Sequence, residues 1–174
     1  MRAPEGAAVG VAVVGLVLAL TACSADRVER GIFHSGKGYQ VTLPPGAWRV
    51  ERDGQADLAL RREEPPAGML ANATCSGKEP ARPLRVLSRH LLFGLTRRSP
   101  VEEVPITMAG RSGVRSVVRG ERDGREVAVD AVVLRDDRCV YDFLYVAPVG
   151  EFESGRPAFA GFLESFAAER RSTP

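Results

Sequence analysis

Apolar and polar residues alternate along several short stretches of the chain, with the two-residue period of half-buried β-strands. The first half contains four such stretches, at residues 39–43, 48–50, 56–60 and 69–74. The second half contains four more, at residues 101–108, 113–119, 126–134 and 139–146. The connections between them are short and rich in turn-forming residues, such as Pro44-Pro45-Gly46 and Asp123-Gly124. Connections of this kind favour antiparallel hairpins over parallel crossovers.

Two other stretches have a helical period. Leu84, Leu87, Leu91 and Leu95 fall on one face of a helix predicted over residues 83–95. Near the C-terminus, a second apolar face consists of Phe159, Phe162, Leu163 and Phe166, with Pro157 expected in the first turn of that helix. The order of four strands, helix, four strands, helix predicts an α+β fold, in which two helices flank an antiparallel sheet.

The N-terminal residues have a different pattern. A short charged start is followed by an uncharged apolar run at residues 7–20 and then by Leu20-Thr21-Ala22-Cys23. This order is typical of a secretory signal peptide, and the tetrapeptide resembles a bacterial lipobox, in which the Cys23 thiol would accept diacylglycerol. The uncharged residues 7–22 number only sixteen, whereas a helix needs about 20 to cross a bilayer. We therefore expect a signal peptide at residues 1–22 and a lipid anchor on Cys23, rather than a membrane-spanning helix.

The expected anchor also predicts where the protein is found. Residues 25–38 are polar and interrupted by glycines, so we expect a lipidated N-terminus and tether at residues 23–37, followed by a single domain at residues 38–170. The predicted location is the bacterial cell envelope. In a host with two membranes, Ser24 after the modified cysteine would direct the protein to the periplasmic face of the outer membrane.

Two further cysteines, Cys75 and Cys139, are expected to meet oxidising conditions after export. We predict that they form one disulfide, which would close a loop of about 65 residues and stabilise the fold by about 4 kcal/mol at most. Free thiols remain an alternative. A metal site that also uses His34 or His90 is a weaker one, because the sequence has no Cys-x-x-Cys or His-x-x-x-His spacing.

Composition adds little about function. The chain has 174 residues, of which 44% are hydrophobic and 26% charged, as in an ordinary folded protein. Its formal net charge is only +2, and the basic residues look evenly scattered, so we expect neither nucleic acid nor anionic lipid to be recognised by charge. No cofactor is predicted.

Residues with catalytic potential are few. His34 falls in the expected tether and His90 in the first helix, beside Arg89, and there is no Gly-x-Ser-x-Gly motif. We therefore expect His90 to be a partly exposed helix residue and His34 a solvated linker residue. A hydrolase would need a nucleophile, a base and an orienting group in reach of one another. The sequence does not predict such an arrangement, and we expect a protein that is not an enzyme.

Carboxylate pairs and a glycine-rich loop also have simpler explanations. Glu102 and Glu103 are neighbours on a predicted strand and should point to opposite faces. Asp136-Asp137 is expected to be a turn. Gly110-Arg111-Ser112-Gly113 joins two predicted strands and lacks the lysine and following helix of a nucleotide-binding loop, so a turn is expected there too.

Apolar side chains allow two other interpretations. Trp48 follows a turn and is either a surface anchor for a partner or a residue at the edge of the core. The phenylalanines of the last helix, together with Leu91-Leu92-Phe93, either pack in the core or line a groove for an apolar ligand.

Several motifs together resemble the Mog1/PsbP-like superfamily. They are the opening stretch at residues 38–48, the central Met108-Ala109-Gly110-Arg111-Ser112-Gly113, the Asp123-Gly124 hairpin and the closing Phe162-Leu163-Glu164-Ser165-Phe166. The resemblance extends over residues 38–169 and implies an antiparallel sheet between helices. Members of the superfamily include a photosystem accessory protein, a GTPase-binding nuclear import factor and bacterial lipoproteins, and most act in binding or assembly. No functional residue of the family maps onto this chain.

The sequence therefore favours a membrane-anchored envelope lipoprotein that acts as a non-catalytic protein-binding or assembly-accessory module. Its expected partners are the membrane, through the N-terminal lipid, and an envelope protein. The alternative is a carrier or chaperone of a small apolar ligand such as a phospholipid, and an undetected hydrolase is a third hypothesis.

Overall fold

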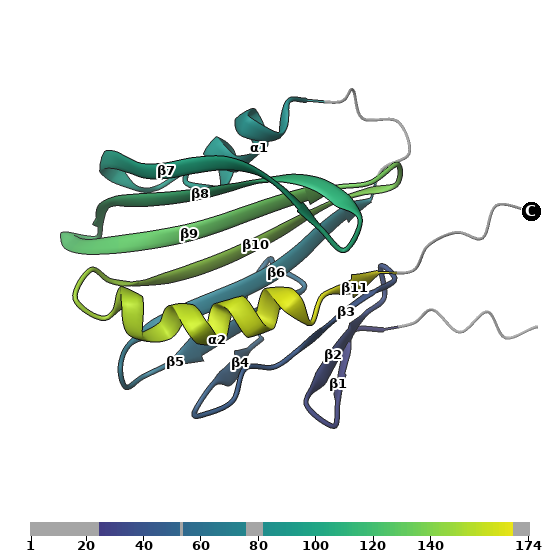
Figure 1. Cartoon of the computed structure of the whole chain (residues 1–174). Coiled ribbons are helices and arrows are strands. Elements are labelled where there is room, and N and C mark those ends of the chain that lie inside the picture. Colours follow the sequence, from purple (N-terminus) through teal and green to yellow (C-terminus); the bar gives the residue numbers. More distant parts are fainter. Residues whose placement is uncertain (1–24, 53, 76–81, 169–174) are drawn as a thin grey trace, which may run out of the picture.

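The computed structural model describes residues 25–52, 54–75 and 82–168 (Figure 1). The predicted signal peptide at residues 1–22 and the lipidation site Cys23 lie outside the described residues. Within them, no helix is long and apolar enough to span a membrane.

Seven strands form one antiparallel sheet, in the order β4-β5-β6-β10-β9-β8-β7. All seven lie at stretches that the alternating pattern predicts, although several extend further than expected. Their bounds are β4 Arg49–Glu51, β5 Leu58–Arg62, β6 Ala67–Cys75, β7 Thr96–Met108, β8 Arg111–Arg122, β9 Arg125–Arg135 and β10 Cys139–Pro148.

Tight two-residue turns connect the long strands. Ala109 and Gly110 join β7 to β8 with φ values of 51° and 73°, and Asp123 and Gly124 join β8 to β9 with φ values of 51° and 75°. Positive φ at both central positions matches the right-handed twist of the flanking strands, and glycine at the second position tolerates it readily. The Asp123-Gly124 hairpin is confirmed. The turn expected at residues 110–113 lies instead at Ala109 and Gly110, and residues 111–113 already belong to β8.

A second, four-stranded antiparallel sheet contains residues that the sequence places in the tether. Its order is β1-β2-β3-β11, with bounds β1 Arg27–Glu29, β2 Ile32–Ser35, β3 Tyr39–Thr42 and β11 Ala167–Ala168. The expected tether is therefore wrong for residues 27–35, which form a hairpin. That hairpin is held in place because the Phe33 side chain, 3% exposed, packs into the main core.

Both predicted helices are present, with different bounds. The first, α1, spans Leu84–Leu91 and is shorter than expected. The second, α2, spans Phe152–Glu164, so Pro157 lies inside the helix rather than in its first turn. The helix begins earlier than predicted because Phe152 is buried and stacks on Tyr145, with 5.3 Å between the ring centroids.

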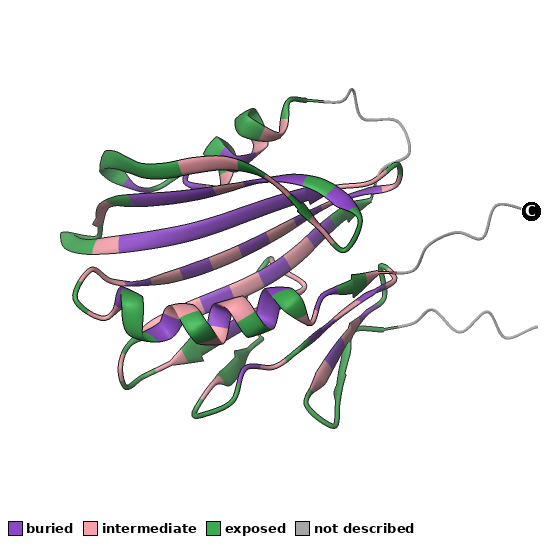
Figure 2. Ribbon diagram, viewed as in Figure 1, coloured by how far each residue is buried: buried purple, intermediate pink, exposed green. Residues whose placement is uncertain are grey.

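The two helices cover opposite faces of the large sheet. On β10, Phe143 and Tyr145 join the core cluster that contains the α2 phenylalanines, whereas Leu144 between them packs with the cluster of Leu92 and Leu95 beside α1. Neighbouring residues of a strand point to opposite faces, so the layers run α1, sheet, α2. Figure 2 shows β9 buried along most of its length, as expected for a strand covered on both sides. This architecture confirms the α+β fold.

Candidate functional site

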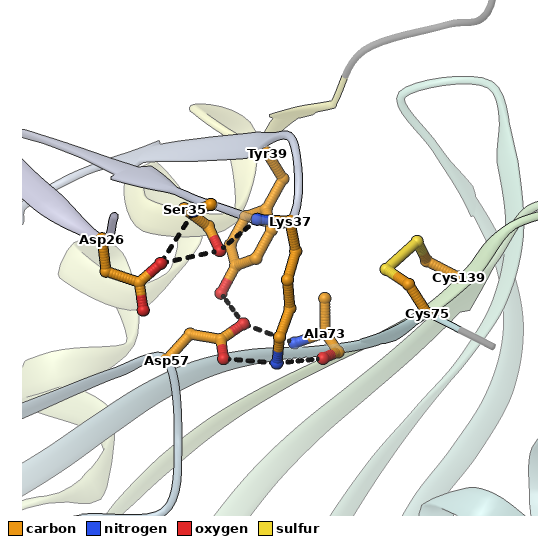
Figure 3. Close-up of polar contacts among 9 residues, drawn as sticks. Asp26, Ser35, Lys37, Tyr39, Asp57, Ala73, Cys75 and Cys139 are labelled. Carbon is orange, nitrogen blue, oxygen red and sulfur yellow. Dashed lines mark hydrogen bonds and ion pairs between the residues drawn. A yellow bond between two sulfur atoms is a disulfide. The ribbon is translucent and has the colours of Figure 1, made fainter. Parts of the chain in front are cut away.

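The two cysteines of the body lie directly opposite each other on neighbouring strands. Cys75 is the last residue of β6 and Cys139 the first of β10, and the two pair in the sheet with their Cα atoms 4.1 Å apart. Their sulfur atoms are bonded (Figure 3). The predicted disulfide is confirmed, and it links β6 to β10 at the end of their pairing.

A buried carboxylate close to this ladder joins the two sheets (Figure 3). Asp57, whose side chain is 7% exposed, accepts a hydrogen bond from the Tyr39 hydroxyl at 3.0 Å and one from the backbone N–H of Ala73 at 2.9 Å. Its other oxygen lies 2.6 Å from Lys37 Nζ, which also donates to the carbonyl of Ala73. We call Lys37, Tyr39, Asp57 and Ala73 the Asp57 cluster.

The Asp57 cluster connects the two sheets through hydrogen bonds and one ion pair. Burial, followed by the adjacent Asp57 charge, raises the pKa of the Tyr39 phenol far above its usual range. The phenol therefore remains a hydrogen-bond donor at physiological pH, and both Asp57 oxygens are occupied. These contacts hold β3 against β5 and β6.

The N-terminal end of the small sheet is fixed by a second set of hydrogen bonds. Asp26 Oδ1 accepts from the backbone N–H of Gly36 at 2.8 Å and from the Ser35 hydroxyl at 3.3 Å. Asp26 is only three positions after Cys23. These hydrogen bonds therefore fix a residue that is close in sequence to the predicted lipidation site.

The predicted turn at Asp136-Asp137 is also a polar hub, which the sequence did not reveal. Asp136 accepts hydrogen bonds from Arg111 Nε at 2.8 Å, from the Tyr141 hydroxyl at 3.1 Å and from the backbone N–H groups of Arg138 and Cys139. Burial works to raise the pKa of Asp136, but these donors outweigh it and lower the pKa below its ordinary value. The carboxylate stays ionised and closes the β9–β10 connection.

The histidines and the glutamate pair do not combine into a catalytic arrangement. His90 is exposed on α1, as predicted, whereas His34 is half-buried on β2 and is not a linker residue. Glu103 Oε1 lies 3.3 Å from Arg85 Nε on the α1 side. Glu102 pairs in the sheet with Val117, whose side chain belongs to the core cluster on the α2 side. The expected opposite orientation is therefore confirmed. Among the described residues, no group of three metal-ligating side chains occurs.

The small sheet bears an open depression of about 360 Å³. Its polar lining comes from Arg27, His34, Ser35, Tyr39 and Gln40. Ser35 and Tyr39 are already engaged by Asp26 and Asp57. The depression therefore lacks a free buried polar group that would hold a ligand by itself.

The aromatic candidates pack in or against the core. Trp48 is half-buried against the main cluster, with the Arg62 guanidinium 4.9 Å from its ring centroid. Phe159, Phe162 and Phe166 are at most 4% exposed. The structure thus confirms core packing for these side chains.

Phe93 is the exception, because 90% of it is exposed. Leu92 and Leu95 on either side of it are buried against the sheet, and Gly94, with a φ of 98°, makes the turn between them. This turn directs the ring outwards. Val86, on α1 itself, is a second large apolar residue with an exposed side chain, at 38%. We call the exposed side of residues 82–98 the α1 surface.

No protein-family model matches the chain, and no curated protein matches its sequence. Solved structures do match. LpqN of Mycobacterium tuberculosis, described as involved in cell envelope biogenesis, gives a TM-score of 0.60 at 16% identity, covering 76% of this chain and 86% of LpqN. A Bacteroides thetaiotaomicron protein gives a TM-score of 0.56 at 8% identity; the match covers 78% of this chain but only 46% of that protein.

A third match bears on the resemblance found in the sequence. The solution structure of cyanobacterial PsbP (CyanoP) from Synechocystis sp. PCC 6803 gives a TM-score of 0.54 at 12% identity, covering 86% of this chain and 99% of CyanoP. Identities this low establish shared architecture alone. Because the match covers most of both chains with a TM-score above 0.5, this chain has a PsbP-like fold.

Proposed function

We propose that this chain is a lipid-anchored, non-catalytic module of the bacterial cell envelope that binds a protein partner through the α1 surface. The single observation that carries the proposal is Phe93, a large apolar side chain that is 90% exposed. Exposing such a ring to water is unfavourable, and aromatic side chains of this kind are common anchors in protein interfaces.

The surroundings of Phe93 support a binding role. The ring is held on a turn whose two neighbouring leucines are buried, so it is presented on a rigid base. A rigid anchor loses little conformational freedom when a partner binds. The likeness to LpqN, described as involved in envelope biogenesis, and the resemblance of residues 20–23 to a lipobox support the proposed location.

The test compares two exposed apolar side chains. Phe93→Ser should remove a co-purifying protein when the full-length lipoprotein is extracted from its membranes in mild detergent and examined by native mass spectrometry. Val50→Ser is the matched control, because Val50 is 44% exposed and lies on β4, at the opposite edge of the large sheet from β7. Retention of the same partner by Phe93→Ser would count against the proposal.

A further inference from the structure

The α1 surface is strongly basic. Residues 82–99 contain five arginines and His90 but no aspartate or glutamate. All five arginines are exposed: Arg82, Arg85, Arg89, Arg97 and Arg98. The net charge of +2 for the whole chain conceals this local concentration. The expectation that basic residues are evenly scattered is wrong for this segment.

Only part of this positive charge is neutralised within the described structure. Glu103 pairs with Arg85 at 3.3 Å, and Glu121 pairs with Arg97 at 3.1 Å. The described carboxylates make no ion pair with Arg82, Arg89 or Arg98. The guanidinium of Arg135, which donates to the carbonyl of Arg82, brings a further cation to the edge of this surface.

The arginines flank the exposed apolar side chains along the sequence. Phe93 lies between Arg89 and Arg97 in the sequence, and Val86 lies next to Arg85. An apolar centre with a charged rim is the usual composition of a protein interface, in which the rim charges select the partner and speed association. Figure 2 shows the outer side of α1 exposed, so the surface is open to a partner.

We infer that the α1 surface receives an acidic protein surface, with an apolar pocket for the Phe93 ring and aspartates or glutamates around that pocket. This inference rests on the proposed function and specifies the chemistry of its partner. Arg89 and Arg98 are the residues expected to contribute most, because both are exposed and neither is neutralised by a described carboxylate.

An anionic membrane would also attract arginines beside an exposed phenylalanine, but the position of the N-terminus favours a protein. In Figure 1, α1 lies at the top of the molecule, and β1 and β2 lie at the bottom. Asp26, fixed to the β2–β3 connection, is three positions from the predicted lipid on Cys23. Phe33 of β2 packs with the phenylalanines of α2, on the face of the large sheet opposite α1. A lipid anchor beside β2 would therefore hold that side of the sheet at the membrane, with α1 on the other side.

The test uses the full-length lipoprotein in the envelope of the bacterium that produces it. Residue 93 is replaced by p-benzoyl-phenylalanine, which keeps an aromatic ring, and the chain is cross-linked by light in three backgrounds. These are the otherwise unchanged chain, Arg89→Glu with Arg98→Glu, and the control Arg49→Glu with Arg52→Glu, which changes the net charge equally around β4. Thermal melts confirm that each variant folds.

We expect one protein adduct whose cross-linked peptide is rich in aspartate and glutamate. Its yield should fall at least fivefold in the Arg89/Arg98 variant and stay within twofold in the control. Equal yields in all three backgrounds would overturn the acidic-partner inference but leave the proposed function intact. Absence of a protein adduct would overturn both, and binding to phosphatidylglycerol vesicles but not phosphatidylcholine vesicles would then identify the α1 surface as a membrane site.

Discussion

Ser88 of α1 and Ser116 of β8 share a hydrogen bond, with 2.8 Å between their hydroxyl oxygens. Ser88 is 0% exposed and Ser116 2%. The bond therefore forms where water cannot replace either partner, between the helix that carries the proposed binding surface and the sheet beneath it.

Removing one of these hydroxyls should destabilise the protein, although the hydroxyl is a small group. Ser88→Ala leaves the Ser116 hydroxyl buried without its partner, which costs about 1–3 kcal/mol. The double variant Ser88→Ala with Ser116→Ala should lose less than the sum of the two single variants, because neither hydroxyl is then left alone. Urea unfolding of all four proteins measures this coupling, and strictly additive losses would contradict it.

Asp142 should make the protein less stable as pH rises. Its side chain lies on β10 between Asn72 of β6 and Val133 of β9, and burial raises its pKa to about 6. In the unfolded chain, an aspartate carboxyl has a pKa near 3.9. The folded state therefore holds the Asp142 proton more tightly, and the free energy of unfolding falls as pH rises from about 4 to about 6. Above pH 7 the loss is on the order of 3 kcal/mol.

The variant Asp142→Asn should therefore be more stable than the unchanged protein at pH 7.5, and the difference should shrink towards zero near pH 4. Chemical unfolding at several pH values provides the measurement. Asp137→Asn is the control, since Asp137 is exposed in the adjacent turn. A stability difference for Asp142→Asn that does not change between pH 4 and 7.5 would show that this carboxyl does not titrate as described.

Sequence patterns predicted the long strands well, because strands such as β9 and β10 carry continuous or alternating apolar residues that only a sheet covered by helices can bury. The hairpin of β1 and β2 was missed because Val28, Ile32 and Phe33 are its only strongly apolar residues. Its stability comes from long-range contacts, above all the burial of Phe33 in the main core.

The Asp57 cluster and the contacts of Asp136 could not be predicted from the sequence, because they also depend on residues far apart in the chain. Lys37 and Asp57 are 20 residues apart, and Arg111 and Asp136 are 25 apart, so no local spacing links them. The disulfide was predictable because only two cysteines follow Cys23 and the predicted export would make their oxidation favourable. The exposure of Phe93 depends on the turn at Gly94, whereas its sequence neighbours Leu91 and Leu92 suggested a buried stretch.

The disulfide should contribute substantially to stability. It joins residues 64 apart in the sequence, and removing a cross-link of this span costs about 3–4 kcal/mol through the greater freedom of the unfolded chain. Cys75→Ser with Cys139→Ser should show this loss in urea unfolding, and dithiothreitol should then have no further effect. A non-reducing digest of the unchanged protein that lacked the linked Cys75 and Cys139 peptides would contradict the bridge itself.

Cys23→Ala should abolish lipid attachment. The thiol is the proposed site of the thioether, so the variant should neither incorporate labelled palmitate nor remain with the membrane fraction, because several acyl chains are needed for lasting attachment. Ser24→Ala is the matched control and should stay acylated. Palmitate labelling of Cys23→Ala equal to that of the unchanged chain would eliminate the proposed anchor.

The Asp57 cluster should determine whether the N-terminal hairpin stays attached to the large sheet. Asp57→Ala leaves the Tyr39 hydroxyl and the Ala73 N–H without an acceptor, and we expect a loss of about 2–4 kcal/mol. Lys37→Ala is the informative comparison, because the Lys37 side chain is 42% exposed and its removal leaves the other two hydrogen bonds to Asp57 in place. Its effect should be about 1 kcal/mol or less.

Hydrogen exchange of residues 27–42 should rise in Asp57→Ala before that of β9. Equal effects of the two variants would mean that the ion pair, rather than the buried acceptor, holds the two sheets together.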